Sequence, residues 1–156
     1  MAATNEMLRF MMKQSATVAV SLSVAAMALS PCAAIARAEP YYSFQSPSGN
    51  VYCGLGQSDA TTFAACEIRD HTWVAPPRPT PCMGGWGDRV SMRQGSAPQM
   101  SCHTDTLKDP ASPVLDYGGT RSLNSLQCDS EISGMTCTDS SSGHYFRLAR
   151  DNYELH

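Results

Sequence analysis

Residues 125–137 read SLQCDSEISGMTC, two short strand-like runs on either side of residues 131–134, a segment with turn chemistry. Folding this stretch as a hairpin about Ile132 and Ser133 places Cys128 directly opposite Cys137. Facing residues in a non-hydrogen-bonded antiparallel pair lie roughly 4.5 to 5.5 Å apart, which a disulfide can span. The stretch therefore predicts a β-hairpin closed by a cross-strand disulfide.

The same geometry applies to an earlier part of the chain. A hairpin folded about Asp59 and Ala60, with residues 57–62 as its loop, sets Cys53 opposite Cys66. The remaining pair is then Cys82 with Cys102. Six cysteines allow fifteen pairings, and local structure favours this one without excluding the others.

The rest of the chain is also typical of an all-β protein. Helical periodicity is nearly absent, and short alternating runs are bounded by Gly, Pro, Ser and Asp. We expect a small single-domain antiparallel sheet or barrel-like domain held by three disulfides. The expected strands are residues 41–45, 50–55, 63–68, 86–93, 114–117, 123–129, 135–139 and 144–149, with 150–155 as a helical turn or a last strand.

Two segments between these strands have specific interpretations. Trp86, Val90 and Met92 alternate with polar residues, so they are expected to point inward from one strand. Residues 73–81 read WVAPPRPTP, which favours an extended polyproline II path. We expect a structural strap crossing one face of the sheet; the alternative is a ligand for a proline-reading domain.

The beginning of the chain predicts a signal peptide. Residues 15–29 are small or apolar and uncharged, with Arg9 and Lys13 before them. About 15 residues are too few for the roughly 20 that span a membrane. We expect cleavage after Ala38, in the sequence Ala-Arg-Ala, with cleavage after Ala36 as the alternative. Cys32 would be discarded with the signal; the alternative is that it carries a lipid.

Cleavage after Ala38 leaves 118 of the 156 residues, enough for one domain, 39–156. That part holds eight basic and 13 acidic residues, a formal charge of −5. The sign argues against nucleic acid and anionic membranes as partners. No second apolar run follows, so we expect a soluble, monomeric product, secreted or held in the cell envelope.

The six remaining cysteines are predicted to form disulfides and not a metal site. An even number of cysteines in a short exported chain is typical of a disulfide framework. Zinc motifs space cysteines two to four residues apart, whereas the closest pair here, Cys128 and Cys137, is nine positions apart. His71, beside Asp70 and Trp73, is interpreted as a solvated loop residue. No metal or other cofactor is expected.

Several ordered blocks resemble a family of small exported proteins of unknown function from mycobacteria and related actinobacteria. The resemblance spans about residues 41–153 and implies an exported single domain, but no activity. The blocks are FQSPSGNVYC (44–53), CEI (66–68), PPRP (76–79), WG (86–87), CHTDT (102–106), LDYG (115–118), SGMTC (133–137) and GHYFRLAR (143–150).

Catalytic motifs are absent: the sequence contains no G-x-S-x-G, no H-E-x-x-H and no phosphate loop. The best candidate constellation is His103 with Asp105, next to Cys102. A carboxylate beside a histidine can fix its tautomer for general-base work. A further partner and a nucleophile would complete such a site. Asp88 or His144 could be the partner, and Ser142 or Ser91 the nucleophile. The favoured interpretation is that these residues are structural and that the protein is not an enzyme.

Three functional hypotheses follow. The favoured one is a binding module for a protein or an envelope glycan, with Tyr41, Tyr42 and Tyr145 as exposed aromatics. The second is an inhibitor of a secreted hydrolase, acting through a protruding loop at residues 140–143 or 54–62. The third is a small hydrolase that uses His103 and Asp105.

Overall fold

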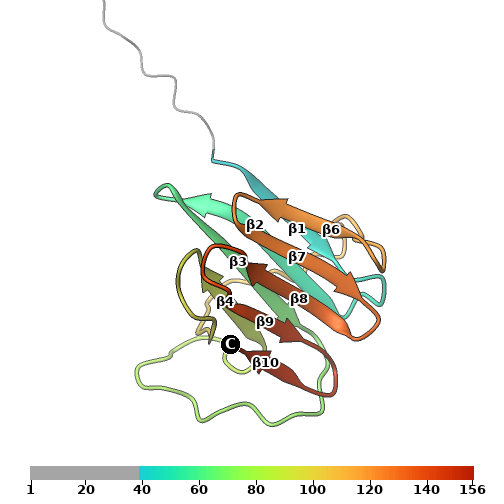
Figure 1. Cartoon of the computed structure of the whole chain (residues 1–156). Helices are drawn as coiled ribbons and strands as arrows, with labels where there is room; N and C mark the ends of the chain where they lie inside the picture. The colour runs from blue at the N-terminus through green and yellow to red at the C-terminus, as the bar shows by residue number, and fades with distance from the viewer. Residues whose placement is uncertain (1–38) are drawn as a thin grey trace, which may run out of the picture. The chain divides into compact units, whose positions relative to one another are not determined.

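The computed structural model describes residues 39–156, which form ten strands in two five-stranded antiparallel sheets (Figure 1). The signal peptide, its cleavage site at Ala38 and the lipid alternative at Cys32 lie outside the described residues. The first sheet has the order β1-β2-β3-β4-β5, and its strands are β1 (Tyr41–Gln45), β2 (Val51–Ser58), β3 (Thr61–Ile68), β4 (Arg89–Arg93) and β5 (Gln99–Met100). The second has the order β10-β9-β8-β7-β6, and its strands are β6 (Thr120–Leu123), β7 (Leu126–Glu131), β8 (Gly134–Asp139), β9 (Tyr145–Leu148) and β10 (Tyr153–Leu155).

The β2–β3 hairpin is tighter than expected. Asp59 and Ala60 both have positive φ, 51° and 61°, as the two central residues of a type I′ turn do. Pairing therefore continues to Ser58 opposite Thr61, where the sequence suggested a six-residue loop. The register is the predicted one, with Cys53 opposite Cys66.

The prediction of a single strand at residues 123–129 is wrong. Asn124, with φ of 52°, forms a tight turn with Ser125 and divides the segment into β6 and β7. Asparagine tolerates this left-handed conformation better than most residues because its short side chain bonds locally. In place of the three strands expected at residues 123–129, 135–139 and 144–149, the C-terminal part forms a five-stranded meander, and residues 153–155 form its last strand.

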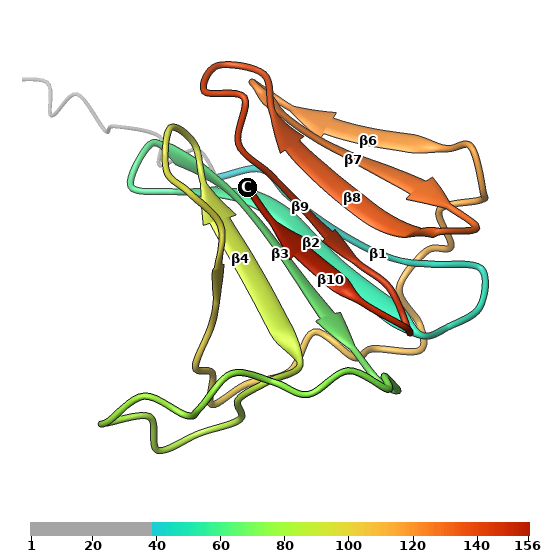
Figure 2. The ribbon, with the colours of Figure 1, turned by 60° about the horizontal axis from the view of Figure 1, so that its bottom comes forward.

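The two sheets face each other across one apolar core. In Figure 2 the orange and red strands of the second sheet lie against those of the first. On β7 and β8 every second side chain is buried, as expected for strands with one face in a core. The largest buried apolar side chains of this core come from both sheets: Phe44, Leu55, Ile68, Val90, Met92, Leu126, Met135, Phe146 and Leu148.

Three disulfides are present, with the pairing that the hairpin geometry favoured. Cys53–Cys66 joins β2 to β3, and its Cα atoms are 4.1 Å apart. Cys128–Cys137 joins β7 to β8 across 4.0 Å. Cys82–Cys102 spans 5.7 Å outside the strands, between the β3–β4 connection and the segment after β5.

The connection between β3 and β4 differs from expectation. The strand begins at Arg89, so Trp86 lies before it, half-buried, and donates its indole N–H to the Pro76 carbonyl at 2.8 Å. Residues 77–81 are exposed, and the segment extends away from the sheets instead of crossing a sheet face (Figure 2). The prolines cannot donate to a ladder, and no neighbouring strand of the described chain lies beside them.

The expected strand at residues 114–117 is reduced to one parallel bridge between Val114 and Gln45. Within the described part of the chain there is no helix, and so none that is long and apolar enough to cross a membrane.

Candidate functional site

A cluster of charged side chains lies on the outer face of the first sheet. Neighbouring residues of a strand point to opposite faces. Because Cys66 points into the core, Glu67 points outward, and its cross-strand partner on β4 is Arg89. Both are buried because the segment that follows β5 covers them. A buried charge is strongly destabilising unless it is paired, so the contacts of Glu67 decide what this cluster does.

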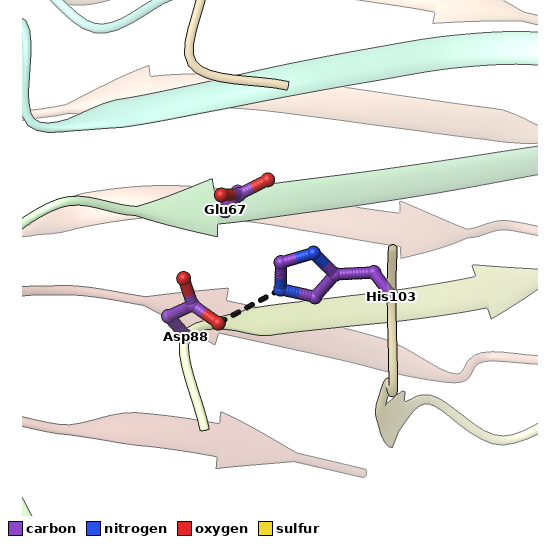
Figure 3. Close-up of side chains that lie close together, drawn as sticks. All are labelled: Glu67, Asp88 and His103. Atoms are coloured by element: carbon purple, nitrogen blue, oxygen red, sulfur yellow. Dashed lines mark hydrogen bonds and ion pairs between the residues drawn. The ribbon is translucent and has the colours of Figure 1, made fainter. Parts of the chain in front are cut away.

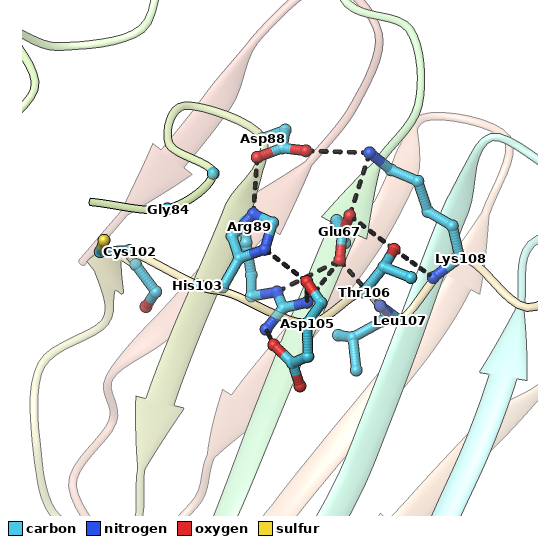
Figure 4. Close-up of polar contacts among 12 residues, drawn as sticks. Glu67, Gly84, Asp88, Arg89, Cys102, His103, Asp105, Thr106, Leu107 and Lys108 are labelled. Atoms are coloured by element: carbon cyan, nitrogen blue, oxygen red, sulfur yellow. Dashed lines mark hydrogen bonds and ion pairs between the residues drawn. The ribbon is translucent and has the colours of Figure 1, made fainter. Parts of the chain in front are cut away.

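Glu67 accepts hydrogen bonds from five donors (Figure 4). Arg89 contributes its Nε at 3.2 Å and its Nη2 at 2.6 Å. The Leu107 N–H and the Thr106 hydroxyl donate at 2.8 and 3.0 Å, and the Lys108 ammonium lies 3.0 Å from Oε1. The carboxylate is fully satisfied, and it fixes residues 106–108 to the sheet.

These contacts determine the protonation state of the cluster. Burial by itself would raise the pKa of Glu67, but hydrogen bonds from Leu107, Arg89 and Lys108 outweigh it and hold the pKa below its usual value. The pKa of Asp88 is lowered in the same way, against burial, by hydrogen bonds from His103 and Lys108. Both carboxyls are therefore ionised at neutral pH.

His103 lies at the edge of this cluster, with both ring nitrogens occupied. Its Nε2 is 2.9 Å from Asp88 Oδ1, and its Nδ1 is 2.7 Å from the backbone carbonyl of Asp105. The carboxylate of Asp105 instead accepts a hydrogen bond from Arg89 at 2.7 Å. The predicted pairing of His103 with the Asp105 carboxylate is therefore wrong: the carboxylate beside the ring is that of Asp88, one of the further partners considered. Neither imidazole nitrogen is free to act on a nucleophile.

The other residues considered for catalysis are bonded to groups other than His103. Ser91 is hydrogen-bonded to Ser101, and Ser142 donates to Asp139 at 2.9 Å. The Nδ1 of His144 is 3.0 Å from the carbonyl of His156. Cys102 is in a disulfide. The structure brings together His103 and Asp88 from that set, and no serine.

Glu67, Asp88 and His103 lie close enough together to be a candidate metal site. Each offers one ligand atom, and these atoms are within 4.8 Å of one another (Figure 3). However, the Lys108 ammonium is 3.0 Å from Glu67 Oε1 and 2.9 Å from Asp88 Oδ2. A fixed cation already neutralises the two carboxylates, so the donor set fits a structural ion-pair network better than a divalent metal.

A second candidate site is a groove of about 450 Å³ at one end of the two sheets. Five connections form it: the β1–β2 turn, the residues after β3, the β5–β6 connection, the β7–β8 turn and the β9–β10 turn. Loops held on a rigid scaffold commonly carry binding residues, and the volume lies in the range of small-ligand sites. The lining includes Asn50, Tyr117, Ile132 and Ser133 together with six charged residues.

The charges of the groove are of both signs and mostly unpaired. Its cations are Arg69, Arg147 and Arg150, and its anions are Asp70, Glu131 and Asp151. Arg147 pairs with Glu154 outside the groove. The other five make no ion pair among residues 39–156.

Neighbouring side chains and carbonyl groups hold two of the three arginines, Arg69 and Arg147, in place. Arg69 lies over the Tyr52 ring, 5.3 Å from its centroid, and donates to the Tyr52 hydroxyl. Arg147 donates to the Ser133 carbonyl and to Glu154, which connects the β7–β8 turn to β9 and β10. These contacts orient the Arg69 guanidinium at the groove, whereas the Nε, Nη1 and Nη2 atoms of Arg147 are all already hydrogen-bonded. Planar guanidinium groups bind carboxylates and phosphates through paired hydrogen bonds.

The tyrosines expected on the surface divide into two groups. Tyr41 and Tyr42 are exposed, and Tyr41 lies over Gly54 and Gly56, where no side chain would fit beneath its ring. Tyr145 is half-buried because it stacks on His156, with ring centroids 4.5 Å apart. Tyr117 of the groove was not singled out from the sequence and is also exposed.

The fold and these sites define a disulfide-bonded, all-β protein of two antiparallel sheets. The chain belongs to a family of unknown function, DUF6636, whose match covers residues 21–156. The searches of curated proteins and of solved structures found no match to this chain.

Proposed function

We propose that this protein is an exported binding module that acts by recognising a ligand and not by catalysis. Three disulfides support an oxidising compartment, outside the cell or in its envelope, as the place of action. Removal of the predicted signal peptide after Ala38 would leave residues 39–156, the part that forms the two sheets, as the exported product. We place that product in the actinobacterial envelope or its surroundings.

The groove at the end of the sheets is the observation that carries this proposal. It is concave, it is built from five connections on a disulfide-stabilised scaffold, and five of its six charged side chains have no ion-pair partner among the described residues. A ligand with hydrogen-bond donors and acceptors, such as an envelope glycan or a polar peptide, would satisfy these groups. Tyr117 and Ile132 add exposed apolar surface at its rim.

The test is a binding measurement on the exported protein with its disulfides intact. Soluble peptidoglycan fragments and envelope polysaccharides are titrated into the ¹⁵N-labelled protein, and amide chemical shifts are followed. We expect changes at residues 46–51, 131–134 and 149–151. Arg69→Ala and Arg150→Ala should weaken binding about tenfold each, the loss expected for one hydrogen bond to a charged group.

Arg93→Ala is the matched control, because Arg93 is exposed on β4 and does not line the groove. Its affinity should equal that of the unchanged protein. Shift changes confined to another surface, or equal affinities for all three arginine variants, would reject the groove as the binding site.

The hydrolase alternative using His103 and Asp105 gains no support from the site geometry, since both imidazole nitrogens are occupied by groups other than a serine hydroxyl. The inhibitor alternative was assigned to residues 140–143 or 54–62. Those turns carry none of the exposed large apolar side chains of the described chain. The connection between β3 and β4 carries two such side chains, Val74 and Met83.

A further inference from the structure

Met83 is a large apolar side chain that is 92% exposed, on the connection between β3 and β4. Single exposed apolar residues are common on protein surfaces and need no explanation. Val74, 90% exposed on the same connection, is such a residue. What distinguishes Met83 is that the backbone is fixed on both sides of it.

On the N-terminal side, Cys82 is bonded to Cys102, and its N–H donates to the Pro79 carbonyl at 2.9 Å. On the C-terminal side, Gly85 and His103 exchange two backbone hydrogen bonds, at 2.6 and 3.1 Å. Cys102 and His103 are consecutive, so one short segment holds both ends of the Met83 loop, which we define as residues 82–85.

Gly84 lies directly against this segment. A Cβ atom at Gly84 would be 2.0 Å from the His103 carbonyl oxygen, so only glycine fits here. The Gly84 carbonyl accepts a hydrogen bond from Arg78. Met83 is thus the residue of the loop that points freely into solvent while its neighbours are held.

The support continues into the charged cluster. His103 is bonded to Asp88 and to the Asp105 carbonyl, and Asp105 is bonded to Arg89, the partner of buried Glu67 (Figure 4). The cluster therefore has a clear role: it fixes the segment on which the Met83 loop is mounted.

We propose that the Met83 loop occupies the substrate cleft of a secreted serine endopeptidase with an apolar primary pocket, and inhibits it. Endopeptidases bind one substrate side chain in that pocket, and Met83 offers an exposed apolar one between a turn at residues 79–82 and the Gly85–His103 bridge. A loop that is already held loses little conformational entropy on binding, so its affinity is high. This inference does not rest on the groove, with which the Met83 loop shares no residue.

The same attachments oppose release after cleavage. Hydrolysis of the Met83–Gly84 bond adds one water and gives a carboxylate at Met83 and an amine at Gly84. The first end stays attached through Cys82–Cys102, and the second through Gly85 and His103. Both ends remain in the cleft, so the cleaved loop continues to block it.

The test uses the exported protein against chymotrypsin and subtilisin, which have apolar primary pockets, and against trypsin, whose pocket carries an aspartate. Hydrolysis of a chromogenic peptide is measured at increasing inhibitor concentration. We expect inhibition of chymotrypsin or subtilisin and none of trypsin. Met83→Lys should transfer inhibition to trypsin, and Met83→Asp should weaken inhibition of the apolar-pocket enzymes at least about 100-fold.

Val74→Asp is the matched control, since Val74 is equally exposed on the same connection, and it should inhibit as the unchanged protein does. Because Met83 is exposed, its variants should keep the unfolding midpoint of the unchanged protein, which is measured alongside. Absence of inhibition by both the unchanged protein and Met83→Lys, or equal inhibition by Met83→Asp, would overturn the proposal.

Discussion

The sulfur atoms of Cys66 and Cys137 lie 3.8 Å apart in the centre of the core. One belongs to the disulfide between β2 and β3, the other to the disulfide between β7 and β8. With both sulfurs oxidised, this is a van der Waals contact and not a hydrogen bond. The two cross-strand disulfides therefore pack against each other and join the sheets at their centre.

The first prediction follows from this contact. Chain entropy alone gives about 3 kcal/mol for each disulfide, slightly more for Cys82–Cys102, which closes the longest loop. The double variant Cys53→Ala/Cys66→Ala also removes core packing, so it should be destabilised more than Cys82→Ala/Cys102→Ala. Urea unfolding measures both. The reverse order would show that the sulfur contact adds little to stability.

The strand pairing and the disulfide within each hairpin could be predicted from the sequence. The turn residues and the cysteine spacing indicated the register that places Cys128 opposite Cys137, because a hairpin is a local structure. The packing of one sheet against the other could not be predicted. Strand alternation shows which side chains share a face, but not which other face they contact.

The polar sites were harder to predict, for a related reason. Glu67 is the one charged residue in the run TTFAACEI (61–68), and this was a usable signal for a paired charge. Its donors at residues 106–108 are about 40 positions away, and no spacing rule connects them. The Asp88–His103 pair was among the options considered, whereas the groove depends on five connections that meet only in the folded chain.

The second prediction concerns the buried carboxylate. Glu67→Gln keeps the side-chain size but leaves Arg89 and Lys108 without their shared counter-charge. We expect a loss of about 3 kcal/mol in the free energy of unfolding, in the range for breaking a buried ion pair. Glu131→Gln, at an exposed position, should change it by less than about 0.5 kcal/mol. Equal effects would mean that Glu67 is not structurally important.

The third prediction concerns acid. The pKa of buried Asp139 is strongly lowered: burial opposes ionisation, but hydrogen bonds from the Gly95 N–H and from Ser141 outweigh it. A carboxyl whose pKa is lower when folded stabilises the protein above its unfolded pKa, and this contribution is lost as the pH falls through the folded pKa. Glu67 and Asp88 act in the same direction. Stability should therefore fall steadily below about pH 4.5.

The measurement is the urea midpoint between pH 7 and pH 3. Asp139→Asn should lower the midpoint at pH 7 and flatten its dependence on pH. Asp116→Asn is the control, because Asp116 is exposed, and it should leave the slope unchanged. An Asp139→Asn curve parallel to that of the unchanged protein would contradict the assignment.

The fourth prediction compares two glycines with positive φ. Gly134, at φ of 137°, begins β8 and lines the groove, and a Cβ there would be 2.8 Å from the Leu148 carbonyl oxygen. Gly143, at φ of 79°, has open space around the same position. Gly143→Ala should therefore cost about 1 kcal/mol from backbone strain alone, and Gly134→Ala about 2 kcal/mol or more, because β8 must shift from β9. Thermal unfolding of both variants distinguishes crowding from strain: equal losses would show that the Leu148 contact relaxes without resistance.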